Sequence, residues 1–253
     1  MQANRTRHES SHGFLFLLGE CPKRGSNTLP TLPDSSWKLY TEHVSAGDQH
    51  GRDLFAERGV WDVRVTRTAM VLGSRQHESL LNNELCVRDG IDVVRRRSGG
   101  GIVFLAPGEH VWLDVVVPRA DVLWSDDVAR ASWWLGDVWV QTLNTLGMNN
   151  VSVHRESLSS DAWGDLLCFA GVGPGEVVQH HDAALSKVVG ISQRRTRDYA
   201  RFQCTIYTKW NPHDVEMYVR NTPGNLSEIA HRVAMVQASQ QAIVDTFVSH
   251  LPL

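Results

Sequence analysis

Two short stretches of the sequence combine cationic side chains with glycines, a combination that can hold a small acid. The first is an unbroken run of three arginines, one serine and three glycines: Arg95, Arg96, Arg97, Ser98, Gly99, Gly100 and Gly101. Glycines let backbone N–H groups approach a ligand closely, and arginines add charge-assisted hydrogen bonds to a carboxylate or phosphate. The run predicts a site for a small acid or a nucleotide, although a flexible hairpin with a solvated basic face fits the same residues.

The glycine run matches neither of the two common phosphate-binding motifs. A P-loop needs a Lys-Ser/Thr pair after its last glycine, and none follows here. A dinucleotide-binding turn leads into a helix, whereas here another strand-like run follows.

The second stretch holds a lysine in strand-like surroundings. Alternation along a strand would place Lys187 on one face with Val189 and Ile191, and Val188 and Gly190 on the other. A lysine that shares its face with aliphatic side chains is either an edge residue or a buried cation that needs an anionic partner. A simply solvated lysine is the more common case.

Short strand-like runs and a few helices are expected around these two stretches. The helical pattern is strongest at 126–146, with Ser125 as N-cap and Gly147 as the stop, and its tryptophans are interpreted as packing residues. A short helix is expected within 77–90 and a terminal helix at 226–250. The expected strands are 61–65, 69–72, 91–97, 101–106, 110–118, 166–178, 185–195 and 200–210. Without regular βαβ alternation, this order predicts an α+β fold with a mixed, mostly antiparallel sheet flanked by helices.

Composition restricts the class of protein. The formal net charge of −3 gives no general attraction to nucleic acid, and no apolar run approaches the ~20 residues of a membrane helix. The four cysteines show no CxxC spacing, which argues against a zinc knuckle and fits reduced thiols in a cytoplasmic protein. The apolar run at 14–18 is too short for a secretory signal. Residues 1–36 are predicted to be a disordered leader, and 37–253 a single catalytic domain.

Three motifs in this order resemble the lipoate–protein ligase and octanoyltransferase family, relatives of the biotin ligases. The family pattern has two arginines, one residue, Ser/Thr and three glycines, and much later Lys-x-x-Gly-x-Ala/Ser-Gln, which match 95–101 and 187–193. Upstream, 68–76 reads TAMVLGSRQ and is similar to the family's PTVVLGxxQ strand and turn. The resemblance spans about 61–210, and three ordered motifs are far more specific than one. It implies the catalytic fold shared by lipoate and biotin ligases.

The resemblance implies a cleft in which the glycine loop wraps an acyl chain, with Lys187 pointing at the acyl carbonyl or an adenylate phosphate, where a fixed cation stabilises developing negative charge. Val71, Val189 and Ile191 would help to line the slot for the chain. The substrate-binding residues implied are Arg96, Ser98, Gly99, Gly100, Gly101, Val103, Gly73, Gln76, Gly190 and Ser192. No metal site is expected, and His180, His181 and Asp182 are interpreted as a solvated turn.

The activity implied is that of a ligase. ATP with Mg²⁺ would activate lipoate or octanoate as acyl-AMP, which a lysine of a lipoyl carrier domain, of the 2-oxoacid dehydrogenase or glycine cleavage type, would then attack. An alternative is an ATP-independent octanoyltransferase that takes its acyl group from acyl carrier protein as a thioester on Cys168, with Lys187 favouring the thiolate. A buried structural cysteine is the simpler interpretation of Cys168.

Departures from the family pattern support a third alternative, a non-catalytic lipoyl- or acyl-binding protein. Leu105 and Ala106 stand where the family has a His-Asp pair, and Glu109 replaces an asparagine. Only about forty residues follow Trp210, too few for the accessory C-terminal domain of the two-domain ligases, so a ligase would need a separate accessory protein. The basic residues Arg194, Arg195 and Arg197 are predicted to steer an acidic carrier domain.

Overall fold

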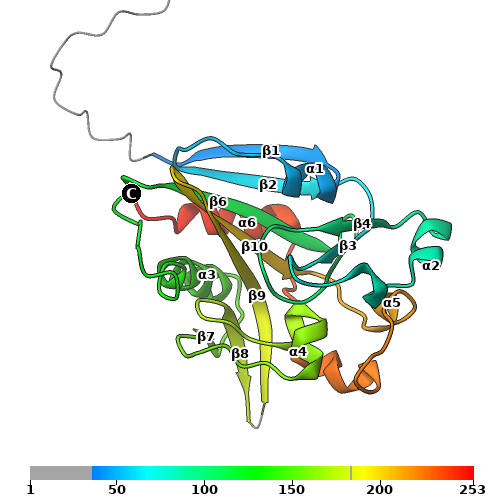
Figure 1. The fold of residues 1–253 in the computed structure, drawn as a ribbon. Coiled ribbons are helices and arrows are strands. Elements are labelled where there is room, and N and C mark those ends of the chain that lie inside the picture. The colour runs from blue at the N-terminus through cyan, green and yellow to red at the C-terminus, as the bar shows by residue number, and fades with distance from the viewer. Residues whose placement is uncertain (1–35, 183) are drawn as a thin grey trace, which may run out of the picture. The chain divides into compact units, whose positions relative to one another are not determined.

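A seven-stranded sheet forms the centre of the computed structural model, which describes residues 36–182 and 184–253 (Figure 1). Its first pair of strands is parallel and every other pair is antiparallel. The strands in spatial order are β1 (Lys38–Val44), β2 (Gly59–Val65), β6 (His110–Pro118), β10 (Tyr199–Tyr207), β9 (Ala184–Arg195), β8 (Val177–His181) and β7 (Val151–Val153). This confirms the predicted mixed, mostly antiparallel sheet.

A smaller sheet carries the 68–76 motif and the glycine run at 95–101. Its order is β4 (Asp92–Arg95), β3 (Ala69–Leu72) and β5 (Val103–Leu105), with β3 parallel to β4 and antiparallel to β5. The 73–76 turn follows β3, and the glycine run connects β4 to β5. The two motifs therefore leave the same small sheet.

The large sheet separates two layers. On β6, Val111, Leu113 and Val115 face a core that contains α3 (Trp133–Thr145) and α6 (Gln240–Ser249), where Trp139 packs on Phe247 at 4.2 Å between ring centroids. On the opposite face Trp112 and Val116 pack with residues of the small sheet. This alternation places the helices on one face and the small sheet on the other.

The remaining helical elements are short and lie in the connections. They are α1 (Ala46–Gly51), η1 (Glu78–Leu80), α2 (Asn83–Arg88), α4 (Ala162–Leu166), η2 (Cys168–Ala170), α5 (His213–Glu216) and η3 (Leu226–Arg232). Gly90, at φ +66°, follows α2 and ends the short helix predicted within 77–90. None of the helices in the described part combines the length and the apolar character that a membrane span requires.

The helix predicted at 126–146 begins seven residues later, at Trp133, with Ser132 as the N-cap residue. The Asp127 side chain accepts a hydrogen bond from the Ala129 N–H, and its carbonyl accepts from the Ala131 N–H, so a local turn replaces the first helical turns. Val128 is exposed rather than packed. The predicted stop is confirmed, since Gly147 follows the helix at φ +85°.

Two other predicted elements are wrong. The terminal helix at 226–250 is interrupted, because Val233 pairs with Lys187 as an extended bridge before α6 starts after its N-cap Ser239. The predicted strand at 166–178 is instead helical turns, α4 and η2, followed by a loop into β8. In both places tertiary pairing overrides the local apolar pattern. The predicted leader, 1–36, lies outside the described residues except for Ser36.

A β-bulge in β9 changes which residues face the small sheet. Val177 of β8 pairs with Val189, but Val178 pairs with Lys187, so Val188 is an extra residue in β9. Val188 and Val189 both lie in the core under the helices. The predicted face of Lys187, Val189 and Ile191 is therefore wrong, because simple alternation does not continue through the bulge.

Candidate functional site

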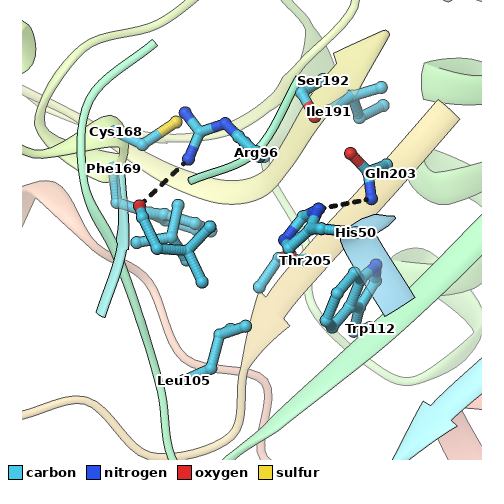
Figure 2. Close-up of a pocket in the computed structure, with 13 residues that line it drawn as sticks. His50, Arg96, Leu105, Trp112, Cys168, Phe169, Ile191, Ser192, Gln203 and Thr205 are labelled. Atoms are coloured by element: carbon cyan, nitrogen blue, oxygen red, sulfur yellow. Dashed lines mark hydrogen bonds between the residues drawn. The ribbon is translucent and has the colours of Figure 1, made fainter. Parts of the chain in front are cut away.

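A narrow slot lies between the two sheets, next to α1 (Figure 2). The slot is narrow, with a cavity volume of about 40 Å³. Its walls come from the large sheet, the small sheet, α1 and the η2 segment. The lining residues are His50, Val71, Arg96, Val103, Leu105, Trp112, Cys168, Phe169, Gly190, Ile191, Ser192, Gln203 and Thr205.

A wider cleft with a volume of about 600 Å³ opens outside the slot. The glycine loop forms one side of this cleft, and Gln76 and Lys187 also line it. Cys168, Ile191 and Ser192 line both the slot and the cleft. These three residues therefore mark the boundary where one space leads into the other.

The structure brings the separate sequence motifs together. The Ser98 hydroxyl donates to the Ser192 hydroxyl at 3.1 Å, across 94 residues of sequence. The Ser74 N–H donates to the Ser98 carbonyl at 2.9 Å. The glycine loop, the turn after β3 and the bulged strand β9 thus meet at one point.

Three of the glycines are required by the packing of the chain on itself. A Cβ at Gly73 would lie 1.9 Å from the Gly100 carbonyl oxygen, and one at Gly101 would lie 2.7 Å from the Cys168 nitrogen. Gly100 has φ +94°, which disfavours any L side chain. Gly99 alone in the loop faces open space, because a Cβ added there would meet no atom of a non-neighbouring residue within 4 Å. Gly73 lines neither space, so it contacts the backbone of the glycine loop rather than the slot or the cleft.

Gln76 fastens the β3 turn to α4. Its Oε1 accepts from the Gly73 N–H at 3.0 Å, and its Nε2 donates to the Asp165 and Leu166 carbonyls at 3.0 and 3.1 Å. Its amide is therefore occupied by the backbone, which makes Gln76 a positioning residue at the rim of the cleft.

Arg96 is the arginine of the run that enters the slot. It is 4% exposed, and its guanidinium donates to the carbonyls of Gly99, Gly101 and Val71. Within the described residues no carboxylate forms an ion pair with it. Arg95 and Arg97 instead point outward, toward Glu78 and Asp53. The slot therefore contains a buried cation held only by backbone dipoles.

Lys187 is a buried cation with an anionic partner. Its ammonium lies 2.8 Å from Glu176 Oε2, donates to the Cys168 carbonyl at 2.6 Å and stands 5.3 Å from the Phe169 ring centroid. Glu176 also accepts the Gly173 and Ile191 N–H groups at 2.6 and 3.1 Å. Side-chain exposure is 2% for Lys187 and 7% for Glu176, so the pair is desolvated. The sequence pattern predicted that a buried Lys187 needs an anionic partner, but it did not identify Glu176. The only local sign of Glu176 is its position just before a valine-rich strand.

Cys168 places its thiol at the boundary of slot and cleft, beside Arg96 (Figure 2). A Cβ at Gly100 would lie 3.5 Å from its Sγ and 2.8 Å from Arg96 Nη2, so both groups border the same point. Its N–H donates to the Ile102 carbonyl at 2.9 Å, and its carbonyl accepts from Lys187. Cys86 and Cys204 are by contrast fully buried in the cores. Cys168 is thus the half-buried thiol among these three.

Polar residues on the inner wall were not expected from the sequence. His50 from α1 and Gln203 from β10 face the slot, with Gln203 Nε2 3.2 Å from His50 Nδ1. Burial lowers the pKa of His50 to about 3; Asp114 opposes this shift, and Arg201 and Arg96 add to it. His50 follows no motif and lies on a six-residue helix, so nothing in its local pattern marks it.

Other predicted residues contribute less. Val71, Val103, Gly190 and Ser192 line the slot, whereas Val189 does not because it lies in the core. The two arginines that end β9 contact other residues of their own chain. Arg194 pairs with Asp53, and Arg195 stacks on Trp124.

The HHD stretch forms ordinary contacts near the β8–β9 turn. His180 and His181 hydrogen-bond the hydroxyls of Ser152 and Ser186. Across 36–182 and 184–253, no three His, Cys, Asp or Glu side chains cluster in a way that could hold a metal ion.

Comparison with known proteins identifies a family. A family model described as the lipoyl protein ligase A/B catalytic domain matches residues 54–248. No curated protein matches the sequence.

Several solved structures share the fold. One, from an archaeal lipoylation system of Thermoplasma acidophilum described as a bipartite lipoate protein ligase and its E2 lipoyl domain, has a TM-score of 0.62 at 14% identity, covering 84% of this chain and 81% of that one. A lipoate-protein ligase A bound with ATP has a TM-score of 0.60 at 13% identity, covering 84% and 83%. P. falciparum LipL1 in complex with lipoate has a TM-score of 0.57 at 13% identity, covering 85% of this chain and 61% of that one. At these identities the likeness shows the fold, and the predicted ligase-like catalytic fold is confirmed.

The glycine contacts predict a graded response to alanine. Gly100→Ala and Gly101→Ala should each lower the free energy of unfolding by about 1–3 kcal/mol, because one needs a left-handed backbone and the other displaces neighbouring backbone. Gly99→Ala should stay within about 0.5 kcal/mol of wild type. Urea unfolding of the three variants measures this. A loss for Gly99→Ala as large as for Gly101→Ala would contradict the assignment.

The buried ion pair predicts strong coupling between its partners. Glu176→Gln should lower the free energy of unfolding by about 3 kcal/mol or more, because it leaves the Lys187 ammonium buried without a counter-charge. Adding Lys187→Met should recover part of that loss. Denaturant unfolding of both single variants and the double variant tests the pair, and simply additive losses would show that the two charges are not coupled.

The neutral His50 predicts a pH dependence of stability. Its pKa is about 3 when folded and about 6.5 when unfolded, so the unfolded chain binds the additional proton between these values. The stability is therefore fully present above pH ~6.5 and is lost as the pH falls toward the folded pKa. His50→Gln, which cannot titrate, should lose less stability than wild type between pH 7 and 5 in urea unfolding. Equal losses in the two proteins would refute a neutral buried imidazole.

Proposed function

Because the chain belongs to the lipoyl protein ligase A/B catalytic domain family, we propose that it transfers a lipoyl- or octanoyl-type acyl group to a lysine of a lipoyl carrier domain. The slot would hold the acyl chain, and the wider cleft would admit the target lysine. The position of Cys168, on the boundary between the two spaces, is the observation that carries this proposal furthest.

The route that this position favours is a thioester on Cys168. The Cys168 thiol gives up its proton, and the thiolate attacks the thioester carbonyl of an acyl carrier protein. The bond from the carbonyl carbon to Cys168 Sγ forms, the bond to the carrier sulfur breaks, and the carrier leaves as a thiolate that takes up the proton released by Cys168. The lysine amine of the lipoyl domain then attacks the new thioester. An amide forms, the amine loses a proton, and the Cys168 thiol is released.

Three groups would support this chemistry. The Arg96 guanidinium, which lacks a carboxylate partner in the described part of the chain, borders the same point as the Cys168 thiol and would supply positive charge beside a thiolate formed there. Lys187 holds the Cys168 carbonyl and so fixes the position of the thiol. The Ser98–Ser192 contact keeps the glycine loop closed over the boundary. The contact between Lys187 and an acyl carbonyl remains a prediction. Glu176 lies beside the Lys187 ammonium and already compensates its charge.

The cleft supports a second candidate, a ligase that forms acyl-AMP. Its glycine backbone and Arg75 could take the phosphates of ATP, and a separate accessory protein would belong to this candidate. ATP with Mg²⁺ would supply activation of the free acid. The Glu176 carboxylate beside Lys187 counts against this candidate, because it reduces the attraction of that lysine for a phosphate.

Mass spectrometry separates the two routes. Incubation with octanoyl-acyl carrier protein should leave an octanoyl adduct on wild type and on the control Cys86→Ala, and none on Cys168→Ala. Transfer to a lipoyl domain should be lost in Cys168→Ala alone. A fully active Cys168→Ala that exchanges pyrophosphate into ATP in the presence of octanoate would establish the ligase instead.

A further inference from the structure

The inner wall of the slot presents polar atoms that the protein does not satisfy. His50 and Gln203 are each 8% exposed, and both line the slot together with Thr205 (Figure 2). In the part of the chain that the structure describes, no protein group hydrogen-bonds His50 Nε2, Gln203 Oε1 or the Thr205 hydroxyl. None of the three is among the fully buried atoms without a partner, and Thr205 is only partly buried. These atoms face the slot, where a ligand that displaces water must replace its hydrogen bonds.

The hydrogen-bonding roles of these atoms follow from one contact. Gln203 Nε2 can only donate, so His50 Nδ1 accepts at 3.2 Å and the imidazole proton lies on Nε2. The wall therefore offers a donor from His50, an acceptor from Gln203 Oε1 and a hydroxyl from Thr205 that can do either. The lowered pKa of His50 keeps the ring neutral.

The wall is held in place by a buried network behind it. The Asp114 carboxylate accepts from Arg201 Nη2 at 2.6 Å, from Trp112 Nε1 at 3.0 Å and from Gln49. Arg201 also donates to the Gln49 carbonyl at 2.8 Å, which fastens α1 to the sheet. These residues fix His50 against Trp112, with 4.7 Å between the ring centroids. The arrangement is thus preorganised rather than a loose surface contact.

We propose that the slot selects an acyl group that carries a neutral hydroxyl, bound by His50, Gln203 and Thr205. The proposal rests on the proposed function in treating the slot as the acyl site. The stem of such a group would pack on Val71, Val103 and Leu105, and its hydroxyl would satisfy the donor and the acceptor of the wall. The substrate class is therefore a hydroxylated medium-chain acid.

Cationic and purely apolar groups fit less well. A cationic group would meet the nearby charges of Arg96 and Arg201. An unsubstituted alkyl end would remove water from three polar atoms and return no hydrogen bond. A site built to bond a hydroxyl discriminates strongly against the analogue that lacks it.

Calorimetric titration of the full chain with free acids tests the inference without requiring catalysis. The probes are octanoate and three octanoates that each carry one hydroxyl, placed near the carboxylate, in the middle or at the end of the chain. At least one hydroxy acid should bind about tenfold or more tightly than octanoate. Gln203→Leu and Thr205→Val should each reduce that preference, while Thr208→Val, on a residue that does not line the slot, should retain it.

The outcomes distinguish this inference from the proposed function. Equal affinities, tighter binding of octanoate, or no binding of any of the acids would overturn the inference. An octanoyl adduct on Cys168 without a hydroxyl preference would sink the inference and leave the transfer reaction standing. A hydroxyl preference without any adduct would support the inference and contradict the thioester route.

Discussion

The buried ion pair between Lys187 and Glu176 is the interaction on which the site depends. Glu176 precedes β8, Lys187 lies in β9, and the ammonium reaches across to the Cys168 carbonyl at 2.6 Å. Taking both charges out of water is expensive and is offset only by good geometry with further hydrogen bonds, which the Gly173 and Ile191 N–H groups supply. The pair thus fixes the sheet and the Cys168 segment in one arrangement, and that arrangement separates the slot from the cleft.

A second buried cation is stabilised in a different way, and this explains the glycine run. Arg96 has carbonyl oxygens as partners, two of them from Gly99 and Gly101 of its own loop. To present those oxygens the loop must turn back on itself, which requires φ +94° at Gly100 and close backbone contact at Gly101. The glycines therefore serve the chain's own packing first. Since Arg96 keeps an uncompensated charge at the slot, the same packing creates the electrostatic environment of the Cys168 thiol.

The sequence predicted the parts of the fold that depend on local pattern and motif order. The strand runs around the motifs and the stop at Gly147 could be predicted because each is encoded within a few residues. The meeting of the two glycine-containing stretches, 94 residues apart, was implied only by the family resemblance. The bulge at Val188 could not, because one extra residue is visible only in the register with β8. Glu176 and His50 could not either, since each acts through a partner far along the chain. The late start of α3 reflects Asp127, whose side chain competes with the helix.

The polar groups of the inner wall of the slot were not predicted from the sequence. Leu105 stands where the family pattern has a histidine, and in the structure it lines the slot as an apolar residue. The polar groups come instead from α1 and β10, on the other side of the slot, and a buried Asp114–Arg201 pair holds them there. A slot that needed only to hold a hydrocarbon chain would gain nothing from a neutral imidazole, an amide oxygen and a hydroxyl, each of which costs free energy when it is desolvated without a partner. An apolar residue thus replaces the expected histidine, and the polar groups of the slot lie on its opposite wall, where they can discriminate between the ligands that enter it.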